Sequence, residues 1–522
     1  MKLFPAFLLS LLVFSQYGCL TTTKVTDWKD AVEQKKYAAA IPLLEKEIEK
    51  EKEPLTKAKM AYNLAECYRF TNQPKRAEAW YKKAIDGGAK PEAIYWYAQT
   101  LKASQKYDAA IKQFRIYLKE EPYLRAEITN EIRACENAKT WMSVHSNYKV
   151  TNMEMANSSA ADFMPAFYQG NKLVFTSSRA GATGENSDQW TGDKFYDLFV
   201  SSVMSDYSLS SAVNFEGFPN SEFHEGSITF SSDFSEAYFT ACGGNQKKVQ
   251  KYYCSIYYSY ALNDGGWSKP QRLPFFADSI NTGSPCLSPD GNRLFMVAKD
   301  PDGFGGTDLY VSKRVEDGWT PAKNLGNAVN TKRNEAFPYI HPDGTLYFSS
   351  DGHAGMGGMD IYTANEISRK WTQVKNMRYP VNSPADDFGI LFVNPEDIKS
   401  EDTLAVGYFC SNRDGGKGDD DMYNFVLEKE KLPPPTYVLK GTVKTKIFRE
   451  KNNPESDVVG YEPLLESEIV IHNETEDYEE ASFPVDEKGK FKIKIDSLTA
   501  YKITASKEPV SYTHLTLPTM RT

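Results

Sequence analysis

The chain is 522 residues long, with 25% charged residues and a formal net charge of -9, and this length leaves room for several domains. The mildly acidic balance argues against a nucleic-acid-binding protein, because such proteins need clustered lysine and arginine. Seven cysteines without a Cys-x-x-Cys pair and six scattered histidines favour neither a zinc site nor a disulfide-rich scaffold. We therefore expect no metal and no other cofactor.

Residues 1–19 are predicted to be a targeting segment. Their apolar run at residues 3–14 is too short to span a bilayer. The run leads to Gly18-Cys19, and a small residue directly before cysteine resembles a bacterial lipobox, although the two preceding residues depart from its common form. That resemblance implies lipidation of Cys19 and an outer-membrane location on the periplasmic face. The alternative is a plain secretion signal that happens to contain a cysteine.

Residues 20–143 are predicted to form paired helices. Apolar residues recur there at helical spacing, and glycine and proline are sparse. Small and aromatic residues also repeat at an interval of 33 residues, in a pattern that resembles the tetratricopeptide repeat. The resemblance implies a concave surface that either binds peptides and partner proteins or serves as part of a spacer. The repeated pairs are Ala65 and Ala98, Ala77 and Ala110, and Tyr81 and Phe114.

Residues 144–430 are predicted to form a β-propeller. Trp267, Trp319 and Trp371 lie 52 residues apart, and short aromatic and β-branched runs alternate between them with Pro-Asp-Gly and Gly-rich turns. A four-stranded blade cannot cover its own faces, so the copies must pack around an axis. The sequence predicts five blades, or six if one has diverged. The expected second strands are 173–175, 237–239, 294–296, 346–348 and 406–409, and the third strands begin at Asp197, Cys254, Asp308, Asp360 and Asp421.

Ring closure is also predicted. The last strand group lacks a fourth strand, whereas residues 148–153 at the start of the region have the pattern of one. We expect this first strand to complete the last blade and so remove the open edge of the sheet. Motifs such as residues 175–179, 348–352 and 409–413 resemble the WD-repeat-like propeller repeat, of the PD40 kind, found in periplasmic proteins of the TolB type.

Partner contacts are expected at the loops between second and third strands, which converge on one face of the ring. Loops on a rigid scaffold often carry binding residues, and Trp190 in the longest loop is predicted to be an exposed aromatic contact. The other candidate partner-binding residues are Arg179, Asp351, Arg413 and Asp420.

Metal binding and catalysis find little support in the motifs. Aspartates at 300–303 and 419–421 could suggest calcium, but their spacing does not match an EF-hand and Gly with Asp suits tight turns. No GxSxG, HExxH, P-loop or SxxK motif occurs, and His224 and His353 are isolated. The sequence therefore predicts that the chain is not an enzyme. Cys242 and Cys254 flank one hairpin and either pair in an oxidising compartment or remain free thiols.

The C-terminal part is predicted to be a proline-rich linker at 431–436 and a small β-sandwich at 437–507. Its strand order, with Gly-Thr-Val at 441–443 and Gly-Lys-Phe at 489–491, resembles the carboxypeptidase regulatory-like domain. Residues 508–522 resemble translated adapter sequence, a non-native tail that we leave out of the fold. The alternative is a genuine short tail.

The order of these parts, a multidomain chain of helical repeats, all-β propeller and small sandwich, resembles the OmpA-family envelope lipoproteins that accompany type IX secretion. The resemblance implies a scaffold that links secretion or gliding machinery to the outer membrane. It also implies contact with peptidoglycan, through an OmpA-like C-terminal domain that is missing after the sandwich. The alternative function is a TolB-like propeller that senses or binds a soluble ligand and has no connection with secretion.

Overall fold

The computed structural model describes residues 25–144, 146–183, 187–188, 190–218, 224–242, 253–429, 437–451, 453–473, 478–495, 501–507 and 510–516. The predicted targeting segment with Cys19 and the predicted linker at 431–436 lie outside the described residues. The chain divides into two compact units, Met1–Thr363 with Asn376–Glu428 and Ala364–Lys375 with Lys429–Thr522. Within the described residues, no helix combines the length and apolar character that crossing a membrane requires.

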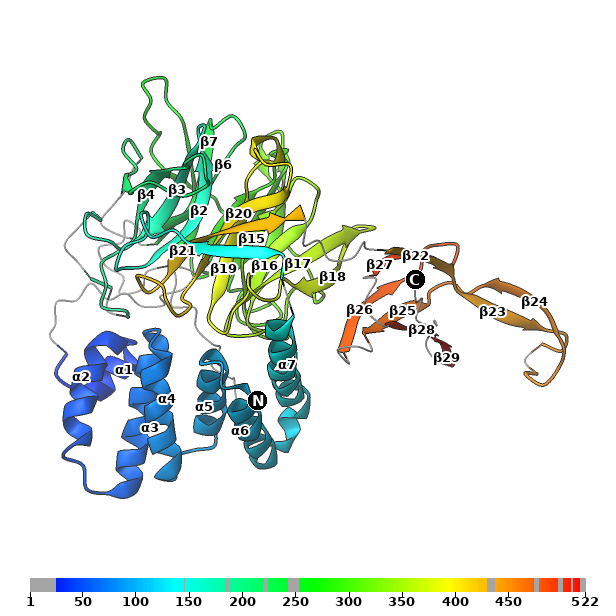
Figure 1. The fold of residues 1–522 in the computed structure, drawn as a ribbon, viewed down its shortest axis with the longest axis horizontal. Coiled ribbons are helices and arrows are strands. Elements are labelled where there is room, and N and C mark those ends of the chain that lie inside the picture. The colour runs from blue at the N-terminus through cyan, green and yellow to red at the C-terminus, as the bar shows by residue number, and fades with distance from the viewer. Residues whose placement is uncertain are drawn as a thin grey trace. The chain divides into compact units, whose positions relative to one another are not determined.

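The first unit begins with helices, as the sequence predicted (Figure 1). Proline stands at the start of α3 and of α4, where its missing N–H leaves no helical hydrogen bond unmade. The repeated alanines are fully buried and let neighbouring helices approach closely, while the rings of Tyr81 and Phe114 fill the space between them. The helices are α1 (Trp28–Glu33), α2 (Tyr37–Ile48), α3 (Pro54–Phe70), α4 (Pro74–Asp86), α5 (Glu92–Ala103), α6 (Tyr107–Glu120), the 3-10 turn η1 (Pro122–Leu124) and α7 (Arg125–Ser143).

Five antiparallel sheets follow as the blades of a propeller-like ring, which confirms five blades over six. The first three blades are β2 (Asp162–Tyr168), β3 (Lys172–Ser177), β4 (Asp197–Ser202) and β5 (Val213–Asn214); β6 (Glu225–Phe230), β7 (Glu236–Cys242), β8 (Cys254–Tyr260) and β9 (Gln271–Arg272); and β10 (Thr282–Leu287), β11 (Arg293–Ala298), β12 (Asp308–Val315), β13 (Gly318–Trp319) and β14 (Lys323–Asn324). The last two are β15 (Glu335–Ile340), β16 (Leu346–Ser350), β17 (Asp360–Ile367) and β18 (Lys370–Asn376); and β19 (Asp387–Phe392), β20 (Thr403–Ser411), β21 (Asp421–Glu428) and β1 (Tyr148–Asn152).

The ring closes as the sequence predicted. Strand β1 pairs antiparallel with β21, with Val150 opposite Phe425, and so supplies the fourth strand of the fifth blade. The Tyr148 ring packs edge-on against Phe425 at a centroid distance of 5.8 Å. All five third strands begin at the residues predicted for them. Closure removes the edge that would otherwise expose unpaired backbone groups.

A carboxylate at the start of the third strand holds the preceding loop in four of the blades. Asp308 accepts the Phe304 N–H at 2.6 Å, and Asp360 accepts the Met356 N–H at 3.0 Å. Equivalent bonds hold Thr183 to Asp197, and Lys417 and Gly418 to Asp421. The Gly- and Asp-rich loops are therefore built turns, in which the aspartate satisfies backbone donors of its own hairpin.

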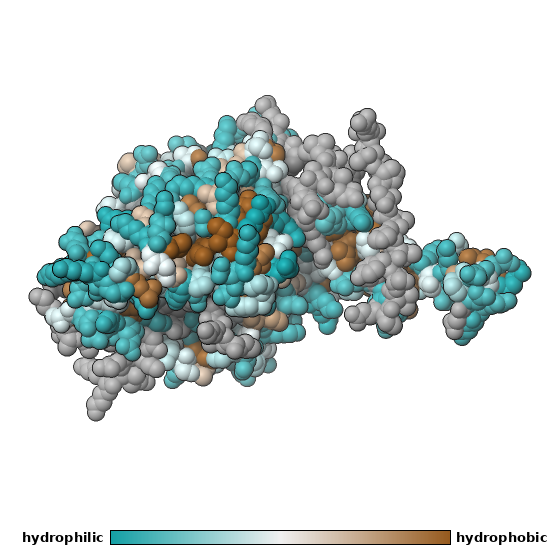
Figure 2. Space-filling model, turned by 90° about the horizontal axis from the view of Figure 1, so that it is seen from below, coloured by the Kyte–Doolittle hydropathy of each residue, from teal (hydrophilic) through white to brown (hydrophobic). Residues whose placement is uncertain are grey.

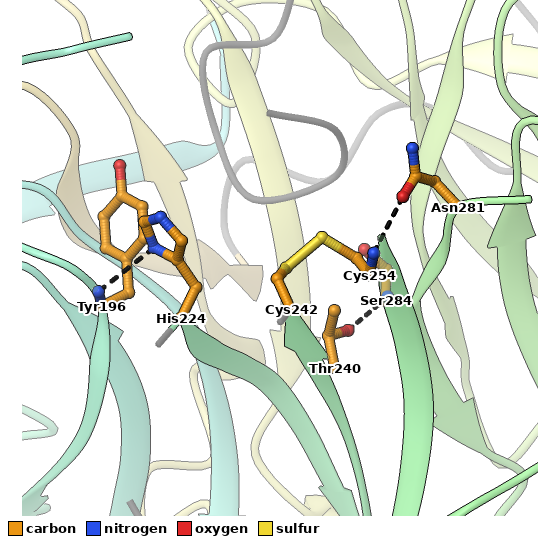
Figure 3. Close-up of a disulfide and its surroundings, with 7 residues drawn as sticks. All are labelled: Tyr196, His224, Thr240, Cys242, Cys254, Asn281 and Ser284. Carbon is orange, nitrogen blue, oxygen red and sulfur yellow. Dashed lines mark hydrogen bonds between the residues drawn. A yellow bond between two sulfur atoms is a disulfide. The ribbon is translucent and has the colours of Figure 1, made fainter. Parts of the chain in front are cut away.

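The second blade carries a cysteine where the other four carry this aspartate. Cys254 forms a disulfide with Cys242, the residue opposite it on β7 (Figure 3), which settles the alternative that the sequence left open. The Cys254 N–H is accepted by Asn281 at 2.8 Å, from the loop that leads to the third blade. In the other four blades, we call the aspartate with its hydrogen bonds to the preceding loop the hairpin clamp. In the second blade, a disulfide bond takes the place of this clamp.

The second unit contains small β-sheets. Strand β22 (Tyr437–Thr442) pairs with β27 (Lys490–Ile495), and β23 (Lys444–Phe448) pairs with β24 (Val458–Pro463). A third sheet has the order β26 (Tyr478–Pro484), β25 (Glu468–Asn473), β28 (Tyr501–Lys507) and β29 (Val510–Thr516). Its core includes Ile469, Ile471 and Ile503. The sandwich stays a prediction, and β29 lies in the segment that we left out of the fold.

The disulfide gives a first testable prediction. Reduction should lower the free energy of unfolding of the propeller by about 3 kcal/mol, because the open chain regains the entropy that a short closed loop removes. Urea denaturation with and without dithiothreitol measures this difference. The double variant Cys242→Ser/Cys254→Ser should unfold like the reduced protein and should not respond to the reductant. A wild-type protein that unfolds identically in both conditions would contradict the prediction.

Candidate functional site

The face of the ring that carries the loops between second and third strands packs against the helices (Figure 1). Turns between paired helices make the contacts. The Ala38 N–H at the start of α2 donates to the Trp190 carbonyl at 3.2 Å. Asn72, between α3 and α4, accepts the side-chain amide of Asn412 at 3.1 Å. The Tyr107 hydroxyl, at the start of α6, donates to the Met356 carbonyl at 3.1 Å. Loops of the first, fourth and fifth blades therefore each contact the helical domain at or beside a turn between helices.

Trp190 is buried in this junction and not exposed, so the predicted exposure was wrong. Its side chain is 4% exposed, and its indole N–H donates to the Phe70 carbonyl at 2.8 Å. The ring lies edge-on to Tyr37, at a centroid distance of 4.8 Å, and to Phe70, at 5.7 Å. The long loop of the first blade thus inserts its aromatic residue into the core of the helical domain. Burial of the large ring is favourable there because its polar N–H also finds a hydrogen-bond acceptor.

A second anchor, Arg333, was not predicted. It lies in the loop between β14 and β15, and its guanidinium contacts Glu131 of α7 at 2.9 Å and the Tyr95 hydroxyl of α5 at 2.5 Å. Lys102 contacts the same carboxylate at 3.1 Å. Burial alone would raise the pKa of Glu131, but these two cations lower it. The only sequence signal for this anchor is a Lys-Arg pair in a propeller loop, which is a weak one.

Such a buried network is costly to break but adds little net stability. Removing ions from water is costly, so a fully paired network adds little net stability, whereas loss of one partner leaves an uncompensated buried charge. Arg333 finds both its carboxylate and its hydroxyl at one place on α5 and α7, so the network joins this loop of the ring to that part of the helical domain.

The other predicted residues also lie near this face, the two arginines partly buried and the two aspartates buried. Arg179 pairs with Asp162 at 2.5 Å in the first blade, and Arg413 pairs with Asp387 at 2.5 Å at the equivalent place in the fifth. Each arginine lies in the loop after the second strand of its blade and pairs with an aspartate at the start of the first strand. The remaining two candidates, Asp351 and Asp420, are buried, and Asp351 accepts the Asn334 N–H at 2.8 Å. Their role in binding a partner stays a prediction.

A cavity of about 890 Å³ opens beside these anchors, between the helix turns and the loops of the fourth and fifth blades. Polar and charged side chains of both walls line it. A second cavity of about 610 Å³ lies between the end of α7, β1 and the same blades. Both are lined in part by Met142, Tyr379 and Arg413.

Buried acids accumulate at this end of the ring. Burial raises the pKa of Asp386 to about 6, of Asp360 to about 7 and of Glu335 to about 8. Burial, followed by the nearby Asp419 carboxylate, raises the pKa of Asp420 well above its usual value. These acids do not converge on one point: among the described residues, no group of three or more His, Cys, Asp or Glu side chains is arranged to hold a metal ion.

His224, which the sequence left as an isolated loop residue, has a packing role. Its ring accepts the Tyr196 N–H at 3.3 Å (Figure 3). It also contacts the rings of Phe195 and Tyr196, at centroid distances of 4.4 Å and 4.9 Å. Burial lowers its pKa to about 3, so the imidazole is neutral at neutral pH. A neutral, buried acceptor of a backbone hydrogen bond supports the fold of the first blade.

Comparison with known proteins finds neither a matching family model nor a matching curated protein. Solved structures do match. An α-L-arabinofuranosidase from Podospora anserina is 12% identical with a TM-score of 0.33, over 52% of this chain and 91% of that one. A GH43 β-xylosidase/α-arabinofuranosidase from a compost microbial metagenome is 10% identical with a TM-score of 0.34, over 53% and 93%. The soluble aldose sugar dehydrogenase of Escherichia coli is 9% identical with a TM-score of 0.29, over 54% and 100%.

These matches correct one expectation. The sequence predicted that the chain is not an enzyme, because it lacks familiar catalytic motifs. That prediction is wrong, since the matched structures include propeller glycoside hydrolases of the GH43 and GH130 families. At such low identity and TM-score, the likeness assigns no activity and no catalytic residue to this chain.

The burial of Trp190 changes what its substitution should do. Trp190→Ala is expected to lower the free energy of unfolding by about 3 kcal/mol, because it leaves a cavity in the helical core. Thermal unfolding of the variant measures the loss. Trp190→Phe, which retains an aromatic ring but loses the bond to the Phe70 carbonyl, should unfold between the two. Unchanged stability in Trp190→Ala would show that the loop does not dock on the helices.

The raised pKa of Glu335 predicts a pH dependence. Its folded-state pKa of about 8 exceeds the ordinary value of 4.5, so the folded protein holds this proton more tightly than the unfolded chain. The resulting stability is complete below pH 4.5 and is lost as the pH rises through 8. The melting temperature of Glu335→Gln should therefore fall less steeply between these pH values than that of the wild type. The exposed Glu396→Gln should keep the wild-type slope, and equal slopes in all three proteins would contradict the assignment.

Proposed function

We propose that the chain is an interaction scaffold of the bacterial envelope, which presents the helices and the propeller to partner proteins as one platform. The observation that carries this proposal is the junction itself: Trp190 and Arg333 of the ring are anchored in the helical domain. Two repeat architectures joined in this way position binding loops on a rigid support. The side seen in Figure 2 is mostly hydrophilic with an apolar area near its centre, as on surfaces that meet other proteins.

The cellular setting follows from the resemblance described above. An outer-membrane lipoprotein, anchored through Cys19 and facing the periplasm, would bind proteins of the type IX secretion or gliding machinery, as implied by the resemblance to the component PorE. The disulfide between Cys242 and Cys254 supports an oxidising compartment. In the resembling proteins the wall contact belongs to an OmpA-like domain, so contact with peptidoglycan would come from that domain.

The lipid anchor is tested by Cys19→Ser. The variant should move from the membrane fraction to the soluble periplasmic fraction, because acyl chains at Cys19 would provide the membrane affinity. Wild-type protein should incorporate labelled palmitate, and the variant should not. As a matched control, Cys67→Ser, which changes a buried cysteine of α3, should leave both fractionation and labelling unchanged. A wild type without label, or a variant that stays in membranes, would overturn the lipoprotein proposal.

A further inference from the structure

We propose that the two cavities at the junction form one groove that binds an extended polypeptide segment of a partner protein. The inference rests on the proposed function as a scaffold and names the surface and the kind of ligand. The groove runs between the turns of α3–α6 and the end of α7 on one side and the loops of the fourth and fifth blades on the other.

The shape of the groove favours a chain over a compact ligand. Cavities of about 890 Å³ and 610 Å³ share Met142, Tyr379 and Arg413 as lining residues, so they adjoin one another at these three residues. One reaches the turn between α3 and α4, and the other reaches β1, the closing strand of the ring. An extended segment contacts both ends, whereas a small molecule would fill only one cavity.

The charges of the two walls specify the composition of the segment. The helical wall contributes Lys75 and Arg76, and the propeller wall contributes Asp414 and Asp419. Lys75 and Asp414 meet across the groove at 2.8 Å, with side chains 73% and 85% exposed. An ion pair so exposed contributes little to stability, and its partners can therefore exchange with charges of a ligand. A segment that carries both acidic and basic side chains complements these walls.

An exposed aromatic side chain supplies a contact of another kind. Tyr379 lies where the cavities meet and is 40% exposed, and exposed tyrosines in such positions are enriched among binding hot spots.

The test uses the full chain, immobilised, and a phage-displayed library of random dodecapeptides as the probe. Selected peptides, synthesised with a fluorescent label, are titrated against the wild type and against two groove variants, Tyr379→Ala and Lys75→Glu/Arg76→Glu. We expect binding to weaken at least about tenfold in each variant. The matched controls are Tyr260→Ala, with a tyrosine 46% exposed outside both cavities, and Lys112→Glu/Lys119→Glu on the exposed side of α6. Both controls should bind as the wild type does.

Three results would overturn the inference. They are a selection that yields no peptide above background, peptides that bind the groove variants as tightly as the wild type, and binding of xylotriose that depends on Tyr379 in the absence of any peptide. The titration uses purified protein and needs no membrane. If the chain binds peptides but Cys19 is not lipidated, only the envelope proposal is contradicted. If Cys19 is lipidated but no peptide binds, the groove is not the partner-binding surface.

Discussion

Closure of the ring is the constraint on which the rest of the first unit depends. A blade of four strands exposes unpaired backbone at its edge until another strand covers it, and in the fifth blade that strand is β1. Since α7 ends at Ser143 and β1 begins at Tyr148, the strand that completes the ring is also the strand tied to the helices. The helical domain is therefore tethered beside the fifth blade, within reach of the loops that hold it.

Two different forces then fix the orientation of the helices on the ring. Trp190 contributes apolar burial among Tyr37 and Phe70, which favours contact but specifies geometry loosely. Arg333 contributes directional bonds to Glu131 and Tyr95, which add little net stability and tolerate few alternative placements. Apolar burial and directional hydrogen bonds thus come from separate loops of the ring.

Most of the propeller could be predicted from the sequence because its evidence is periodic. Tryptophans at a fixed interval and an aspartate or cysteine at the start of each third strand mark repeated local structure, and the clamps at Asp308 and Asp360 show the physical cause of that repetition. The junction could not be predicted in this way. Exposure of Trp190 depends on what the helices place opposite it, and Arg333 occurs in one loop only, so neither carries a repeating signal.

The disulfide of the second blade makes the stability of one hairpin depend on the surroundings of the chain. Four blades carry their clamp as an aspartate, which works as soon as the hairpin folds, whereas the second blade needs Cys242 and Cys254 to be oxidised. In a reducing compartment the newly made chain therefore lacks one hairpin clamp. One cysteine in place of the repeated aspartate thus links the stability of the second blade to the redox state of its surroundings.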